Sequence, residues 1–370
     1  MADGVAIAEA IQGGGSANAR GLTYPLGDPP GPGEAVAAAP GVLWMRLPLP
    51  MALNHVNVYA IEDGDGWTLV DTGMRTKDSS EGWKAALAGP LGGKPIRRVI
   101  GTHMHPDHIG LADWLTQRWN VPMWISATDY HVARAAIVST AGFGGSAAAA
   151  FMASHGLVDP ESLDKIRARS NYYANMVPNL PARYRRLMDG DRVRIGGVDW
   201  TCHAGHGHAP EHIALHCAEL GVLISGDMVL PRISTNISVL DVEPEGNPLP
   251  LYLASIERLR DLPPATLVLP SHGRPFGGPA AANGAGGLHT RIDQLQHHHD
   301  ERLAEVLHAC AEAPHSAADL LDVMFKRKLD LHQTTFAMGE AIAHVNALWL
   351  AGDLRREVDG DGVMRFTAAR

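Results

Sequence analysis

The chain has 370 residues, of which 45% are hydrophobic and 19% are charged, and its formal net charge is −9 at pH 7. This composition is typical of a globular protein with one large domain or two smaller ones. The acidic balance argues against nucleic acid or an anionic membrane as a partner, because both attract basic surfaces.

The N-terminal segment has neither the basic start nor the apolar core of a signal peptide. The three cysteines, Cys202, Cys217 and Cys310, are an odd number without C-x-x-C spacing. Free thiols of this kind are typical of a reducing compartment. We therefore expect a cytoplasmic protein with no membrane partner, and a homodimer is left open.

Two styles of sequence follow one another in the first part of the chain. Residues 1–40 are rich in Gly, Pro and Ala and are expected to form a surface arm. Residues 41–285 alternate short runs of β-branched and aromatic residues with helical segments, as in "VNVYAIED" and "GWTLVDTG", which the turn "DGDG" joins as a hairpin. This alternation predicts a layered α/β domain.

Two further segments differ from that pattern. Residues 128–185 are Ala-rich and predict a helical insertion that caps one end of the sheet. Residues 286–370 predict helices followed by a β-hairpin, which is a winged-helix-like arrangement. The last helical sequence, "TTFAMGEAIAHVNALWLAG", has no Lys or Arg, so we expect a packing or substrate-capping domain rather than a DNA reader. The histidines at 297–299 point in three directions around a helix and are interpreted as a solvated or capping patch.

The segment "THMHPDH" places His103, His105, Asp107 and His108 on one turn between a buried strand and a helix. A buried turn tolerates so many titratable groups only when they have partners. Imidazole and carboxylate groups are common metal ligands. The turn offers two adjacent ligand sets and completes neither, because a catalytic zinc ion takes three protein ligands and a water.

Later strand ends carry the missing groups, in the segments "GHAPEH", "ISGD" and "PSHGRP". Ligands of open layered folds gather at strand ends. Together with Asp71 in "LVDTG", these motifs occur in order over residues 41–280, and they resemble the metallo-β-lactamase superfamily. The resemblance implies a four-layer αββα sandwich and two metal ions, with zinc expected and iron or manganese as alternatives.

The resemblance also implies the ligands. The first ion would take His103, His105 and His208, the second Asp107, His108 and His272, and Asp227 would bridge the two. Gly205-His206 offers a second register for the "GHAPEH" ligand, so His206 is the alternative to His208.

The implied chemistry is hydrolysis by a metal-bridging hydroxide. The catalytic carboxylates would be Asp107 and Asp227, which orient the nucleophile and pass on its proton. Asp71 either supports a ligand from behind or is a plain turn residue, and His212 is expected behind the ligands. The candidates for the substrate pocket are Tyr172, Tyr173, Arg232 and Asn236.

The leading interpretation is a hydrolase of a small ester, thioester or lactone, with the glyoxalase II-like thioesterases as the nearest broad class. The C-terminal unit resembles the small domain of the β-lactamase-like protein 2 branch, so an endoribonuclease of that type is one alternative, which the acidic charge disfavours. An iron-dependent persulfide dioxygenase is another, because those enzymes reuse the same ligand set.

Overall fold

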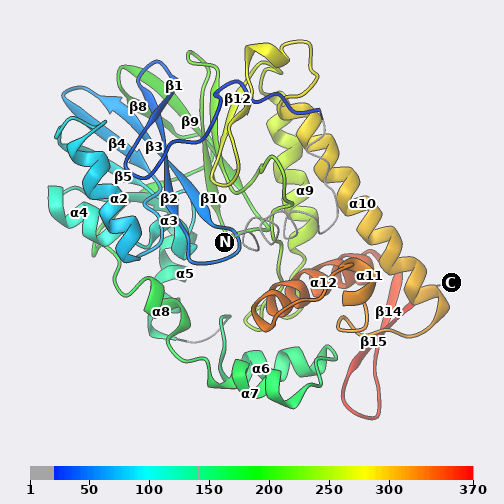
Figure 1. The fold of residues 1–370 in the computed structure, drawn as a ribbon. Helices are drawn as coiled ribbons and strands as arrows, with labels where there is room; N and C mark the ends of the chain where they lie inside the picture. Colours follow the sequence, from blue (N-terminus) through cyan, green and yellow to red (C-terminus); the bar gives the residue numbers. More distant parts are fainter. Residues whose placement is uncertain (1–20, 140–141, 370) are drawn as a thin grey trace.

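Two β-sheets pack face to face in the computed structural model, which describes residues 21–139 and 142–369 (Figure 1). The first sheet has the strand order β1 (Val36–Ala39), β2 (Val42–Pro48), β3 (His55–Asp63), β4 (Gly66–Val70), β5 (Ile96–Ile100), β6 (Met123–Ser126) and β7 (Tyr184–Leu187). The second has the order β13 (Phe276–Gly277), β12 (Leu267–Pro270), β11 (Val222–Gly226), β10 (His212–Cys217), β9 (Val198–Gly205) and β8 (Arg192–Ile195). β1 to β4 pair antiparallel, and β4 to β7 pair parallel.

The central strands are buried on both faces, because one face packs on the other sheet and the other face is covered by helices. Every residue of β4 and of β11 is buried, which matches the continuous apolar sequences "GWTLV" and "VLISG". Trp44 and Tyr59 of the first sheet meet Trp200 and Leu215 of the second in the core between the sheets. Cys202, Cys217 and Cys310 are buried and free.

Helices complete the four layers. The outer face of the first sheet is covered by α2 (Lys77–Ala88), α4 (Ala112–Trp119) and α5 (Ala127–Val138). The second sheet is covered by α9 (Pro248–Arg258), which the short helix η1 (Leu259–Asp261) extends, and by the start of α10 (Leu288–Glu312), with η2 (Pro279–Ala281) between them. The predicted αββα sandwich is confirmed.

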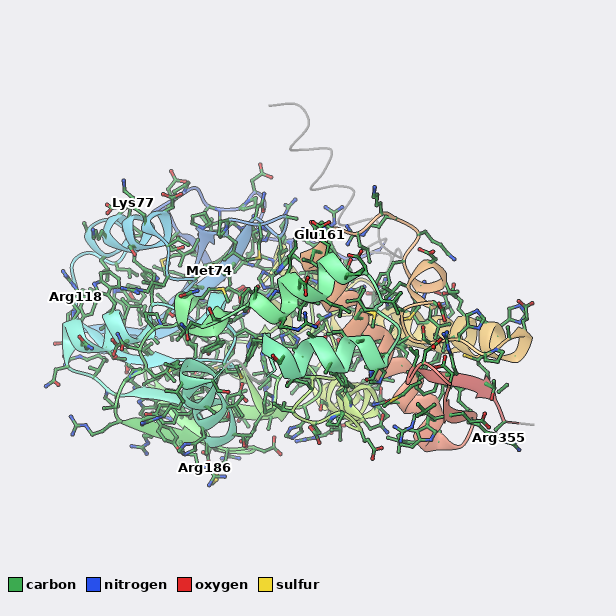
Figure 2. All side chains as sticks on the ribbon, turned by 90° about the horizontal axis from the view of Figure 1, so that it is seen from below. Met74, Lys77, Arg118, Glu161, Arg186 and Arg355 are labelled. Atoms are coloured by element: carbon green, nitrogen blue, oxygen red, sulfur yellow. The ribbon has the colours of Figure 1, made fainter. Side chains whose placement is uncertain are left out.

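The segment between β6 and β7 is helical, as predicted for residues 128–185. After α5 it contains α6 (Gly145–Ser154), α7 (Pro160–Ala168) and α8 (Tyr172–Met176). Seen from below, α6 and α7 lie side by side across this face, with Glu161 on α7 (Figure 2). Phe151 and Met152 of α6 join the apolar cluster of the C-terminal helices rather than that of the first sheet.

The C-terminal region continues from α10 into α11 (Leu321–Met324), α12 (Leu331–Ala351) and the hairpin of β14 (Leu354–Val358) and β15 (Met364–Ala368). Asp330 begins α12 with a capping box, and Gly352 ends it in the left-handed conformation, with φ at 87°. α10 packs on the second sheet at its start and on α12 further along, so both regions share it. Within the described residues, no helix has the length and apolarity that a bilayer crossing requires.

The structure differs from the sequence predictions in the N-terminal segment and at residues 297–299. Of the predicted arm, residues 1–20 lie outside the described residues, and Val36–Ala39 pair with β2 as part of the first sheet. The interpretation of residues 297–299 as a solvated patch is wrong for two of the three side chains. His297 is exposed, but His298 and His299 are buried because α9 and α12 both cover α10 there: the His299 ring lies 5.8 Å from that of Tyr252 and its Nδ1 3.3 Å from His344 Nε2.

Candidate metal centre

The histidine turn follows directly from β5 and leads into α3 (Pro106–Ile109). His105 precedes the helix. Pro106 is the first helical residue, and its ring fixes the backbone conformation that the start of a helix needs. The next two residues, Asp107 and His108, therefore belong to the first turn of α3 and point toward a different side from His103 and His105. His103 and His108 are fully buried.

One group of candidate ligands forms around His103. The His103 Nε2 lies 2.9 Å from His105 Nδ1 and 3.2 Å from His208 Nε2. His208 comes from the loop between β9 and β10. Two ligands of a tetrahedral zinc ion lie about 3.3 Å apart when each is about 2.0–2.1 Å from the ion. The three nitrogens therefore have the separation that a shared cation requires.

A second group forms around Asp107. Its Oδ2 lies 3.4 Å from His272 Nε2 and 3.6 Å from His108 Nε2. Asp227, at the end of β11, faces both groups, because its Oδ2 lies 3.4 Å from His208 Nε2, 3.4 Å from His272 Nε2 and 3.6 Å from His108 Nε2. All seven predicted ligands thus converge at the carboxyl-terminal ends of β5, β9, β11 and β12.

The far nitrogens of two of these rings point to backbone carbonyl groups. His208 Nδ1 donates to the carbonyl of Asn236 at 2.7 Å, and His272 Nδ1 donates to the carbonyl of His55 at 2.8 Å. A carbonyl oxygen only accepts, so each Nδ1 carries a hydrogen, and Nε2 is the nitrogen that faces the cluster.

Asp71 orients two further rings, His108 directly and His103 through Thr102. Its Oδ2 accepts from His108 Nδ1 at 2.8 Å and from the Thr102 hydroxyl at 2.9 Å. Because the Thr102 hydroxyl donates to Asp71, its oxygen accepts from His103 Nδ1, 3.0 Å away. Of the two readings of Asp71, this geometry favours the supporting role, as metal-binding histidines usually donate their second N–H to a fixed acceptor.

The family model described as "Metallo-beta-lactamase superfamily" matches residues 52–272, more than half of the chain. The chain belongs to the metallo-β-lactamase superfamily. A second family model, described as "Metallo-beta-lactamase-like, C-terminal domain", matches residues 303–369.

Solved and curated members of the superfamily resemble the chain over most of its length. A β-lactamase domain protein from Burkholderia ambifaria is 48% identical, with a TM-score of 0.87, over 94% of this chain and 98% of that one. The probable metallo-hydrolase YqjP of Bacillus subtilis is 27% identical over 83% of this chain and 92% of its own. The acyl-coenzyme A thioesterase MBLAC2 of Gallus gallus is 27% identical over 64% of this chain and 79% of its own.

The donor set of this superfamily member fits divalent cations. His108 Nε2 and Asp227 Oδ1 are buried and have no hydrogen-bond partner within the described part of the chain, which is costly unless a ligand completes them. Burial lowers the pKa of His105 to about 3, so this ring is neutral and ready to coordinate. Burial opposes charge on His272 as well, but the Asp227 and Asp107 carboxylates raise its pKa to about 10. The same two carboxylates would attract a cation.

Two neighbouring histidines, His206 and His212, lie outside the ligand groups. His206, the alternative to His208, has its Nδ1 against the carbonyl of Pro210 at 2.7 Å and does not join the ligand groups. His212 is fully buried, and its Nε2 accepts from the backbone N–H of Asp227 at 3.1 Å. His212 therefore lies behind a candidate ligand.

The four pocket candidates lie in different surroundings. Tyr173 is buried in the core beside Phe143, and its hydroxyl donates to the carbonyl of Met104 between two candidate ligands, which makes it a support rather than a pocket wall. Tyr172 is half-buried beneath the Arg169 guanidinium. Arg232 is exposed, whereas Asn236 is half-buried and holds His208.

The sequence interpretation missed Asp129, which joins two ligand segments. Its carboxylate accepts from the backbone N–H of Met104 at 2.8 Å and from that of Glu211 at 2.7 Å, while Ser126 begins α5 by accepting from the Asp129 N–H. The only signal in the sequence was a Ser-x-x-Asp pattern after a strand, which by itself predicts a helix start.

Proposed function

We propose that this protein is a hydrolase that binds two divalent metal ions and cleaves a small acyl substrate, with a thioester favoured over an ester or lactone. The observation that carries the proposal is the position of Asp227, whose Oδ2 faces His208 of one ligand group and His272 of the other at the same 3.4 Å. A single carboxylate between two sets of cation ligands is suited to bridging.

His103, His105 and His208 would hold the first ion, and Asp107, His108 and His272 would hold the second. When bound, such ions act as Lewis acids and lower the pKa of a water molecule, which supplies a nucleophile near neutral pH. Zinc suits this mixture of imidazole and carboxylate ligands, with iron or manganese as the alternatives.

The two carboxylates, Asp227 and Asp107, would have different roles. The Asp227 side chain is 8% exposed and its backbone N–H is held by His212, so it is fixed between the ligand groups. The Asp107 side chain is 19% exposed and is the more accessible of the two. Asp107 is therefore placed to accept a proton from the attacking water and to return it to the leaving group.

The choice of a thioester is supported by chemistry and by a relative. The printed name of MBLAC2 describes an acyl-coenzyme A thioesterase, and its similarity extends over 64% of this chain. A thiolate leaves more easily than an alkoxide, so the single accessible carboxyl is sufficient as a proton carrier.

The test is a substrate panel with the metal-loaded protein: acyl-coenzyme A and acyl-glutathione thioesters, aryl esters, lactones and single-stranded RNA. We expect turnover of a thioester, abolished in His208→Ala and retained in the matched control His206→Ala, whose ring bonds Pro210 outside the cluster. Cleavage of RNA with the thioesters left intact, or equal loss in both variants, would contradict the proposal.

A further inference from the structure

Three alternate residues at the start of β3, His55, Asn57 and Tyr59, share the face of the strand that is turned toward the second sheet. Inward positions of a sandwich are expected to be apolar, and Tyr59 does lie in the core between the sheets. Asn57 is fully buried as well. A buried amide costs stability unless it is hydrogen-bonded, so the partners of Asn57 indicate its role.

The partners of Asn57 lie on both sides of the candidate ligand His272. The side-chain amide nitrogen of Asn57 donates to the carbonyl of Pro270 at 2.8 Å and to the carbonyl of Gly273 at 3.0 Å. Its backbone N–H donates to the carbonyl of Ser271 at 2.6 Å. Asn57 therefore spans the turn that carries His272.

Arg46 of β2 fixes the orientation of the Asn57 amide. Its Nε donates to Asn57 Oδ1 at 3.1 Å, so it is the amide nitrogen that faces the two carbonyls of the turn. Arg46 Nη2 also donates to the carbonyl of Gly273 at 2.6 Å. The Tyr59 hydroxyl donates to the carbonyl of Pro270 at 2.7 Å. Both carbonyls that Asn57 contacts are thus held by a second donor from the first sheet.

His55 contacts the same turn twice. Its backbone carbonyl accepts the Nδ1 hydrogen of His272 at 2.8 Å, and its ring Nε2 accepts from the backbone N–H of Gly273 at 2.8 Å. A ring nitrogen that accepts carries no hydrogen, so the ring is neutral and its Nδ1 donates to Asn54 Oδ1, 2.8 Å away. One residue of β3 therefore orients the ligand ring and holds the residue that follows it.

The turn depends on these contacts because glycine follows the ligand. Gly273 is in the left-handed region, with φ at 88°, and a Cβ atom there would lie 2.6 Å from Pro231 Cγ. Glycine has the greatest backbone freedom of all residues and does not fix a turn by itself. The N–H of Gly273 bonds to His55, and its carbonyl bonds to Arg46 and Asn57. The backbone after His272 is thus held by the first sheet.

We propose that Asn57 and His55 are positioning residues of the metal centre, which hold the turn of residues 270–273 so that His272 Nε2 stays directed at the second ion. His272 follows β12 of the second sheet, whereas the side chains that fix its turn come from the first. This inference rests on the proposed metal-binding function, so its test measures metal binding before activity.

The experiment titrates Zn²⁺ into metal-free full-length protein in competition with a chromophoric chelator. His272→Ala is the reference, because it removes a ligand and should abolish one of the two binding steps. We expect Asn57→Ala to weaken this same step about tenfold, as is usual when a supporting hydrogen-bond partner is removed. The other step should keep the affinity that it has in His272→Ala. Thermal melts of each metal-free variant show whether it is folded.

A second pair of variants changes the half-buried His55. His55→Ala keeps the backbone carbonyl that bonds His272 but removes the acceptor of the Gly273 N–H, so it should weaken the same step. His55→Gln can place its amide oxygen near the position of Nε2 and should restore wild-type affinity. This pair decides the question if Asn57→Ala does not fold.

The matched control is Asn346→Ala in α12. The Asn346 side chain is also buried, and its amide nitrogen also donates to two carbonyls, those of Pro244 at 3.2 Å and Gly246 at 3.0 Å. Neither residue is next to a candidate ligand. A loss of buried hydrogen bonds alone should therefore lower the melting temperature of this variant and leave both zinc affinities unchanged.

Three outcomes are decisive. Weakening of the His272-dependent step in the folded alanine variants of Asn57 and His55, with recovery in His55→Gln, supports the inference. Wild-type zinc affinity in either of these alanine variants, or equal weakening in Asn346→Ala, overturns it while the metal centre stands. Absence of zinc binding by the wild-type protein would instead overturn the proposed function.

Discussion

At the residue scale, the orientation of the candidate ligands depends on single side chains such as Asp71. Its backbone is in the left-handed region, with φ at 61°, which is unfavourable by about 1–3 kcal/mol for a residue with a Cβ. The conformation is retained because both carboxylate oxygens are engaged, Oδ1 by the Thr102 N–H and Oδ2 by the Thr102 hydroxyl and His108. A strained residue whose carboxylate contacts one candidate ligand, His108, and the residue that precedes another is typical of a functional site.

Replacement of Asp71 by Asn should weaken zinc binding about 10- to 100-fold. The amide keeps one acceptor oxygen and places a donor where either Thr102 or His108 now donates, so one ring loses its fixed orientation. The chelator-competition titration measures the change. Asp63→Asn is a matched control, because Asp63 bonds Thr68 and Arg98 away from the cluster, and equal affinity in the two variants would contradict the role of Asp71.

Glu340 should make stability depend on pH. Burial raises its pKa to about 7, with Arg302 and Asn236 acting in the opposite direction. Because its pKa is higher in the folded chain than in the unfolded one, the stability from its neutral form is present below about pH 4.5 and is lost as pH rises through 7. Relative to wild type, Glu340→Gln should therefore gain stability across this window, by at most about 3 kcal/mol.

Urea unfolding of both proteins between pH 5 and pH 8 measures the difference directly, since every other titrating group cancels. Free energies of unfolding that run parallel over this range would show that the Glu340 carboxyl is not protonated in the folded chain.

At the scale of elements, the ligands lie where strands end, and separate tethers hold the ligand loops together. Asp129, at the start of α5, joins the loop after β5 to the loop before β10. Tyr173 of α8 supports the first of these loops from behind. The insertion therefore contributes to the rigidity of the centre. We further predict that it caps the metal site and sets substrate choice.

Asp129→Asn should destabilise the protein by about 1–3 kcal/mol, because one of two buried backbone N–H groups would face an amide nitrogen instead of an oxygen. Zinc affinity should fall as well, since Met104 and Glu211 flank candidate ligands. Denaturant unfolding and zinc titration provide the two measurements. Asp113→Asn, on the exposed side of α4, is the control, and a variant with unchanged stability would exclude the tether.

Local patterns made part of this arrangement predictable from the sequence. The histidine turn and the apolar strands before Asp227 and His272 follow from short motifs, and the family resemblance that these motifs carry implied the sandwich. The burial of His299 and the backbone contact between Val239 and Gly339 do not, because they depend on how α12 packs against α10 and the second sheet. Residues about a hundred positions apart meet there, and no periodicity within one helix reports such a contact.

At the scale of the whole molecule, the C-terminal region and the sandwich are joined by shared elements. α10 packs on the second sheet and then on α12, and α6 adds Phe151 to the same apolar cluster. The loop that follows Asp227 thus lies in one continuous apolar cluster with α12, through Ile237 and Val239.

The most direct test of the metal centre is metal quantitation on purified wild-type protein and Asp227→Asn. An amide between two cations carries no net charge to offset their repulsion, whereas the apolar core around β11 is unchanged. We predict about two divalent ions per wild-type chain, loss of about one in the variant with a folded melting profile, and an activity optimum at higher pH. A wild-type chain that binds no metal, or a variant that keeps both ions and full activity at neutral pH, would contradict the account.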